Sequence, residues 1–208
     1  GIKWIADEVM SGFGRTGKWF AYQHSAAQPD LIVFAKGVNS GYVPLGGVII
    51  SDEIAATFND RVFPGGLTYS GHPLATAAAV ATLDVMADEK IVENAALMGE
   101  KVIKPLLEDL MSKHKVIGEI RGKGVFWALD LVTDRATRAP LAPYGASSPA
   151  MNELVAACKK LGLFPFNNYN RMHICPPCNI TEAELREGFA ILDQAFASIA
   201  HHYTGSDK

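Results

Sequence analysis

Apolar residues form two short runs near the start of the chain, and each run ends at a charged residue. Residues 2–6 are apolar apart from Lys3 and lead to Asp7, and residues 31–35 are apolar throughout and lead to Lys36. Runs of this length predict strands that are buried on both faces of a parallel sheet. A third strand is predicted over residues 43–51.

Helical periodicity follows these strands. Residues 76–88 are rich in alanine and predict one helix, and residues 93–113 predict a longer amphipathic helix. The apolar stripe of the longer helix consists of Ile103, Leu106, Leu107, Leu110 and Met111.

A smaller α+β unit is predicted after residue 115. Its expected elements are strands at 116–121 and 125–132, a polar loop at 133–149, a helix at 150–161 and further short strands. Thr181 and Glu184 have the spacing of a capping box, which predicts the start of a final helix that ends near residue 200. The polar tail from His201 is expected to fray. The chain is therefore divided into residues 1–115 and 116–208.

Asp7 and Lys36 are the strongest chemical candidates. Ligands collect at the carboxyl ends of parallel strands, and neighbouring strands lie about 4.7–4.9 Å apart, so one small heterocycle can meet both side chains. Pyridoxal phosphate (PLP) needs such a pair: its aldehyde forms a Schiff base with a lysine, and a carboxylate keeps its ring nitrogen protonated. A structural salt bridge, or two solvated strand ends, explains the same two residues without a cofactor.

Composition excludes several other classes of function. Of the 208 residues, 49% are hydrophobic and 20% are charged, which is typical of a cytoplasmic globular protein with a substantial core. The net charge of −3 without a basic tract gives no reason to expect nucleic acid, and no apolar run is long enough to cross a membrane. No metal site is expected.

Three segments, taken in order, resemble the class III (omega) aminotransferases. They are Asp-Glu-Val-Met-Ser-Gly-Phe-Gly-Arg-Thr-Gly (7–17), Phe-Ala-Lys-Gly-Val-Asn-Ser-Gly-Tyr-Val-Pro-Leu-Gly-Gly-Val (34–48) and Gly-Gly-Leu-Thr-Tyr-Ser-Gly-His-Pro (65–73). The likeness continues to the Cys-Pro-Pro segment at 175–177. It implies an α/β protein of fold type I among PLP-dependent transferases, with residues 1–115 as the C-terminal part of the large PLP-binding domain and its mostly parallel sheet. Residues 116–208 are then the small C-terminal α+β domain.

The resemblance also implies roles for individual residues. Lys36 is the lysine that binds PLP and acts as the catalytic base, Asp7 stabilises the protonated ring nitrogen, and Val9 packs against the ring. Thr68 matches a threonine that reaches across a dimer interface to the phosphate of the partner's PLP, which implies a homodimer with shared active sites. Family members have a long N-terminal half with a Ser-Gly-(Ser/Thr)-Glu-type phosphate turn; no such string is present here, so the chain is expected to be a fragment.

Substrate recognition is where the sequence departs from its relatives. Many class III enzymes place an arginine just before the Pro-Pro pair and use it to bind the α-carboxylate of the substrate, whereas His173 stands at that position here. Arg171 lies two residues earlier, on the same face of a strand, and is either a substitute for that arginine or a charge at the rim. The expected substrates are a terminal amine or omega-amino acid as donor and a 2-oxo acid as acceptor, with glutamate or 2-oxoglutarate as the second substrate.

Several alternatives stay open. Class III also contains racemases, mutases and phospho-lyases with the same lysine and aspartate, and a chain that lacks the N-terminal half is alternatively an inactive interaction module. The string Gly12-Phe13-Gly14-Arg15-Thr16-Gly17 matches a dinucleotide-binding pattern, but no clean helix is predicted after it. The Cys175-Pro176-Pro177-Cys178 string is predicted to be a buried strand end and not a zinc or redox site.

Overall fold

The computed structural model describes residues 1–206 and shows two compact units, Gly1–Glu93 and Asn94–Lys208. The division falls inside helix α3 (Ile91–Met98), because the rest of this helical stretch packs its apolar stripe into the second unit. The domains 1–115 and 116–208 stay a prediction about the longer family fold. Among residues 1–206, no helix is long and apolar enough to cross a membrane.

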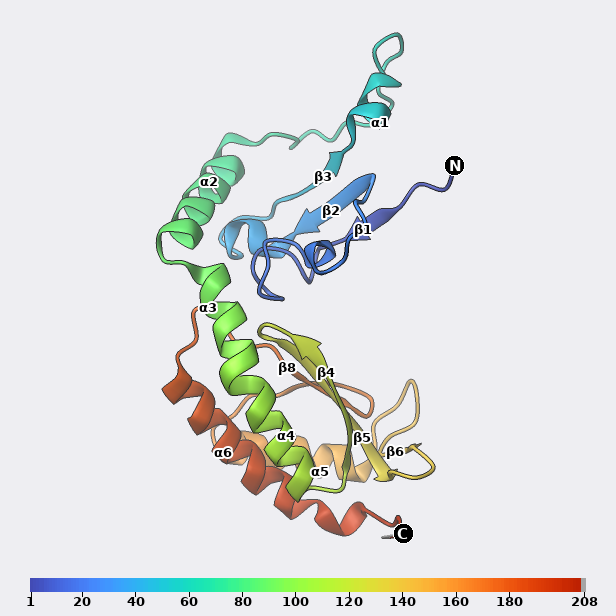
Figure 1. The fold of residues 1–208 in the computed structure, drawn as a ribbon, viewed down its shortest axis with the longest axis vertical. Coiled ribbons are helices and arrows are strands. Elements are labelled where there is room, and N and C mark those ends of the chain that lie inside the picture. The colour runs from blue at the N-terminus through green and yellow to red at the C-terminus, as the bar shows by residue number, and fades with distance from the viewer. Residues whose placement is uncertain (207–208) are drawn as a thin grey trace. The chain divides into compact units, whose positions relative to one another are not determined.

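The first unit contains a three-stranded sheet with the order β1-β2-β3 (Figure 1). Its strands are β1 (Ile5–Asp7), β2 (Leu31–Ala35) and β3 (Gly46–Ile50). β1 and β2 are parallel, with Asp7 opposite Val33, and β3 is antiparallel to β2. The parallel pairing agrees with the prediction from the two apolar runs.

Burial on both faces of these strands, however, was a wrong expectation. Ile5 is 57% exposed, and every residue of β2 is only half-buried. The reason is that residues 1–93 supply three short strands and few elements to cover them. The core of this unit is small and consists of Phe13, Val38, Ala79, Met86 and Val92.

Local sequence signals begin the two helices of the first unit. Ser51 accepts a hydrogen bond from the amide of Ile54 and caps α1 (Asp52–Ala56). Pro73 is the first residue of α2 (Pro73–Asp88), where its missing N–H is not needed. Two 3₁₀ helices follow strand or loop segments at Ala21–His24 and Lys36–Asn39.

The second unit has an antiparallel sheet with the order β4-β5-β8-β7, and a short strand β6 pairs with β5. Leu129, Leu131 and Met172 are fully buried on the face that packs against the helices. Asp130, Arg171 and His173 alternate with them and lie on the other face. The strands are β4 (Ile117–Lys123), β5 (Phe126–Asp134), β6 (Ala139–Pro140), β7 (Phe166–Asn168) and β8 (Arg171–Ile174).

The predicted helix over residues 93–113 is interrupted in the structure. After α3, residues Gly99–Ile103 form a π-helical turn, and α4 (Lys104–Lys113) continues from it. Pro105 has no amide hydrogen to donate to the preceding turn, which disfavours an unbroken α-helix. The absence of a side chain at Gly99 also allows a close approach to the backbone of Gly124. The predicted apolar stripe is confirmed, with Ile103, Leu107 and Leu110 buried.

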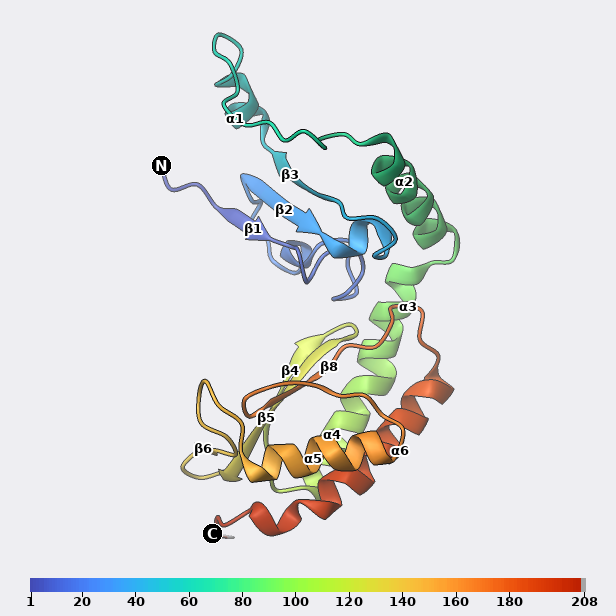
Figure 2. The same ribbon diagram turned by 180° about the vertical axis from the view of Figure 1, so that it is seen from behind.

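The two remaining helices pack against each other (Figure 2). They are α5 (Pro149–Lys160) and α6 (Glu182–Ser198). The capping box is confirmed: Thr181 Oγ1 accepts a hydrogen bond from the amide of Glu184, whose carboxylate accepts one from the amide of Thr181.

Two expectations for the second unit were wrong. Residues 201 and 202 do not fray, because the 3₁₀ helix η4 (Ala200–His202) continues the chain after α6 and follows the fully buried Ile199. Cys175 is exposed, because β8 ends at Ile174 and the two prolines that follow cannot extend a strand in its interior.

Candidate active site

The structure brings Asp7 and Lys36 to the same edge of the first sheet. Asp7 is the last residue of β1, and the amide of Glu8 donates a 2.8 Å hydrogen bond to the carbonyl of Val33, which continues the parallel ladder. Lys36 comes directly after β2. Both residues therefore lie at the carboxyl ends of neighbouring parallel strands, as the sequence predicted.

The backbone on either side of the sheet edge has defined turns. An Asp7 side-chain oxygen accepts a 3.1 Å hydrogen bond from the amide of Val9, which places Val9 in the turn around this carboxylate. Lys36 has a left-handed backbone with φ of 49°. Such a conformation is strained for a residue with a side chain and is often found at functional positions.

A depression of about 530 Å³ lies beside Lys36. Its lining includes Ala35, Asn39 and the segment 43–46. Asn39 is almost fully buried and donates a side-chain hydrogen bond to the carbonyl of Val43, which closes the turn around the depression. A cavity of this volume lies within the usual range for small-molecule sites.

Glu8 is a supporting residue that the sequence analysis missed. Its side chain is 2% exposed. Its carboxylate accepts hydrogen bonds from Ser11 Oγ (2.5 Å) and from the amides of Ala21 (2.9 Å) and Tyr22 (2.8 Å). Two of these donors lie 13 and 14 residues away, so no local spacing could have identified the role.

Glu8 closes the loop that contains the glycine string. Gly14 and Gly17 have positive φ values of 88° and 81°, and a Cβ atom at Gly12 would lie 2.9 Å from the carbonyl oxygen of Glu8. Turns and bends follow this string, where a dinucleotide-binding motif requires a helix. The glycines therefore allow the tight backbone turns of this loop. The ring of Phe13, in the same loop, packs against Phe20 and Phe34.

Thr68 lies in an exposed turn and not at the sheet edge. The amide of Ser70 donates a 2.9 Å hydrogen bond to the carbonyl of Leu67, which closes the turn around Thr68. Large apolar side chains on the same segment face solvent: Val62 is 90% exposed and Leu67 is 80% exposed.

Arg171 and His173 lie in the second unit, on the open face of its sheet. Within β8 they are separated by the buried Met172, and they stand opposite Asp130 and Ala128 of β5. Asp130 forms an ion pair with Arg121. Within residues 1–206, Arg171 itself has no ion-pair partner.

The environment of His173 favours its neutral form. Partial burial lowers the pKa of His173, and the positive charge of Arg171 lowers it further, against a smaller opposite effect of Asp130. Its ring lies 5.0 Å from that of Phe166, between ring centres. Arg121 of β4 lies on the same face but pairs with Asp130, whereas no ion pair of Arg171 is found among residues 1–206. His173 also borders an apolar groove of about 400 Å³.

Comparison with known sequences gives a consistent result. The profile of the family Aminotransferase class-III matches residues 1–196. A taurine–pyruvate aminotransferase from Bilophila wadsworthia is 36% identical over 212 residues, which covers 96% of this chain and 45% of that protein. A putrescine–pyruvate aminotransferase from Pseudomonas aeruginosa is 36% identical over 203 residues, which covers 95% of this chain and 43% of that protein.

Solved structures agree. A taurine:2-oxoglutarate aminotransferase from Bifidobacterium kashiwanohense, in complex with PLP and glutamate, is 43% identical with a TM-score of 0.91, over 96% of this chain and 44% of that one. An S-selective transaminase from an Arthrobacter species is 36% identical with a TM-score of 0.89, over 97% of this chain and 45% of that one. The chain thus spans less than half the length of these relatives. It belongs to the class-III aminotransferase family.

Proposed function

We propose that the protein containing this chain is a PLP-dependent aminotransferase. The observation that carries the proposal is the placement of Asp7 and Lys36 at the carboxyl ends of two paired parallel strands. A carboxylate and a primary amine that share a sheet edge suit a heterocycle with a basic nitrogen and an aldehyde.

The residues present fit this cofactor. Lys36 borders a depression large enough for a small heterocycle, and Asn39 holds the turn around it. Glu8 holds the loop that follows Asp7. Val9, next to the Asp7 carboxylate, offers an apolar side chain to a ring. PLP supplies an electron sink when it is bound.

Each residue of the pair has a distinct task in the proposed reaction. Lys36 Nζ would hold the cofactor through a Schiff base, and its amine, when free, would act as the base that removes a proton from the substrate carbon that bears nitrogen. Asp7 holds a proton on the ring nitrogen by its negative charge. The turn that holds Asp7 in place reduces its freedom to reorient.

The relatives suggest the substrate class. Their names specify taurine, putrescine or 5-aminovalerate as amino donors. We propose a terminal amine or omega-amino acid as donor and a 2-oxo acid as acceptor for this protein too. Arg171, a cation without an ion-pair partner in the described residues, is the proposed binding group for the acid, with His173 beside it.

A homodimer with shared sites is part of the proposal. Exposed apolar side chains around Thr68, including Val62, Phe63, Leu67 and Tyr69, are typical of a surface that contacts further protein. Thr68 would then donate a hydrogen bond to the phosphate in the partner's site. A cytoplasmic location stays a prediction.

A mixed dimer tests the sharing. Lys36→Ala and Thr68→Ala proteins are each expected to lose activity, but a heterodimer of the two has one site with both native residues if Thr68 acts across the interface. Recovery of about half the native activity by the isolated heterodimer, or of about a quarter by an equal mixture in which half of the dimers are heterodimers, supports shared sites. No recovery, with heterodimer formation verified by mass, contradicts them.

Asp7→Asn tests the reaction. A neutral amide holds the ring nitrogen protonated far less well, so transamination should slow by about 100-fold or more. Each tenfold decrease in rate corresponds to an increase of about 1.36 kcal/mol in the activation free energy. The exposed Asp84→Asn change on α2 is the control. Native turnover in Asp7→Asn would contradict the proposed role. The full-length native protein is also assayed with a set of terminal amines and omega-amino acids. Conversion of these compounds without transfer of nitrogen to a 2-oxo acid would indicate a racemase, mutase or phospho-lyase. The absence of cofactor binding would indicate an interaction module.

A further inference from the structure

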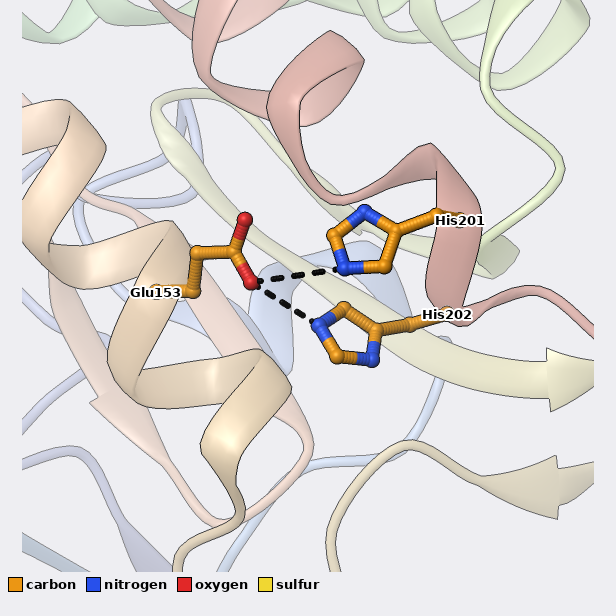
Figure 3. Close-up of side chains that lie close together, drawn as sticks. All are labelled: Glu153, His201 and His202. Atoms are coloured by element: carbon orange, nitrogen blue, oxygen red, sulfur yellow. Dashed lines mark hydrogen bonds and ion pairs between the residues drawn. The ribbon is translucent and has the colours of Figure 1, made fainter.

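Three potential metal ligands, none of them among the candidate active-site residues, meet in the second unit. Glu153 is on α5, and His201 and His202 are on η4 (Figure 3). One ligand atom from each residue can be chosen so that all three lie within 4.8 Å of one another. The two imidazole rings lie side by side, with centres 4.1 Å apart.

Both imidazoles turn a ring nitrogen toward the same carboxylate oxygen, as Figure 3 shows. Glu153 Oε2 lies 2.9 Å from His202 Nε2 and 3.7 Å from His201 Nε2. Three donors around one Zn²⁺ ion, at metal–ligand distances of about 2.0–2.2 Å, stand roughly 3.3–3.5 Å apart. The observed separations bracket this value, and the half-exposed side chain of Glu153 has room to adjust.

The hydrogen bond on the other side of His201 fixes its tautomer. His201 Nδ1 lies 3.1 Å from the carbonyl oxygen of Ser198, which can only accept, so Nδ1 carries the hydrogen. In the neutral ring, Nε2 then presents a lone pair to the Glu153 carboxylate. A proton on Nε2 or a metal ion between the two groups satisfies both of them, and a backbone carbonyl on the far nitrogen is the usual support of a metal-binding histidine.

The backbone around the cluster is held by the core. Met151 and Leu154 flank Glu153 on α5 and are fully buried, and Ile199, just before η4, is fully buried too. The ligands therefore project from two segments that packing already holds together, which reduces the ordering cost of binding.

We propose that Glu153, His201 and His202 form a binding site for a divalent transition-metal ion such as Zn²⁺, with a fourth position open to water. Two imidazoles and one carboxylate suit Zn²⁺ and disfavour Mg²⁺, which prefers oxygen ligands. The ion links η4 to α5 and stabilises the C-terminal end of the second unit.

Calorimetric titration of the metal-free, PLP-loaded full-length protein with ZnCl₂ tests the site. The native protein is expected to bind one more Zn²⁺ ion per chain than the His201→Gln/His202→Gln variant, and Glu153→Gln should weaken that binding by at least about tenfold. Zn²⁺ should raise the melting temperature of the native protein and not of the double variant. Glu187→Gln, which removes an exposed carboxylate from α6, is the matched control and should bind like the native protein.

Equal Zn²⁺ binding by the native protein and the double variant would overturn the proposal. The absence of saturable Zn²⁺ binding would also overturn it, and so would the displacement of bound Zn²⁺ by equimolar Mg²⁺. X-ray absorption at the zinc edge gives a second measurement that needs no variant. Two imidazole nitrogens and oxygen at about 2.0–2.2 Å are expected. Sulfur in the coordination shell would contradict the assignment. These readouts do not depend on transamination.

Discussion

Replacing Glu8 by glutamine tests whether a buried carboxylate holds the loop beside the proposed cofactor site. Both carboxylate oxygens of Glu8 accept hydrogen bonds, three in all, and its side chain is 2% exposed. Glutamine keeps the shape but turns one acceptor into an NH₂ donor, which faces the amide of Tyr22 or the groups at Ser11 and Ala21.

The expected loss of stability follows from these contacts. A hydrogen bond to a charged acceptor contributes about 1.5–3 kcal/mol, and a buried donor left without a partner costs about 1–3 kcal/mol. Because the three bonds share one carboxylate, their contributions do not add fully, and we expect Glu8→Gln to lower the free energy of unfolding by about 2–4 kcal/mol.

Urea denaturation of the cofactor-free full-length protein measures this loss. Glu89→Gln, an exposed change in the same unit, is the control and should stay within about 0.5 kcal/mol of the native value. Affinity for PLP should also fall in Glu8→Gln, because Phe13 in the same loop packs against the backbone at Gly37, next to Lys36. A native unfolding free energy and native PLP affinity in Glu8→Gln would refute this reasoning.

Three further predictions concern other regions. Arg171→Ala should raise the KM for the carboxylated substrate by about tenfold to a hundredfold, from the loss of a charge-assisted bond of about 1.5–3 kcal/mol, whereas Arg186→Ala on α6 should not; unchanged steady-state kinetics would remove Arg171 from the site. The hydrogen bond from His114 (2.5 Å) lowers the pKa of Asp193, so its stabilising effect should be full above the ordinary aspartate pKa of about 4 and disappear at lower pH. Melting curves of the native protein and Asp193→Asn should therefore converge as pH falls, and a gap that widens in acid would contradict this sign. Burial raises the pKa of Cys158 to about 11, so iodoacetamide at pH 8 should modify it only after denaturation; equal labelling of the native protein would contradict its burial.

The strand ends were predictable from sequence because they depend on local pattern. Two apolar runs, each followed by a charged residue, were enough to place Asp7 and Lys36 on one sheet edge, and the Thr181–Glu184 spacing was enough to begin the last helix. These signals are short-range, and the structure preserves them.

Features that depend on contacts distant in sequence were missed. The donors to Glu8 lie up to 14 residues away, and Glu153 meets His201 and His202 from about 50 residues away. The π-helical turn depends on the close approach of Gly99 to Gly124 as well as on Pro105. None of these contacts produces a periodic pattern in the sequence. The sequence therefore predicted a fraying tail from His201, because its contact with Glu153 could not be recognised.

Identification of the lysine that binds PLP tests the central claim most directly. Borohydride reduction of the PLP-loaded full-length protein, followed by peptide mass mapping, should place a pyridoxyl group on Lys36 and none on the same peptide of Lys36→Ala. An adduct on a different lysine of the native protein would contradict the assignment of the active site to the carboxyl edge of β1 and β2.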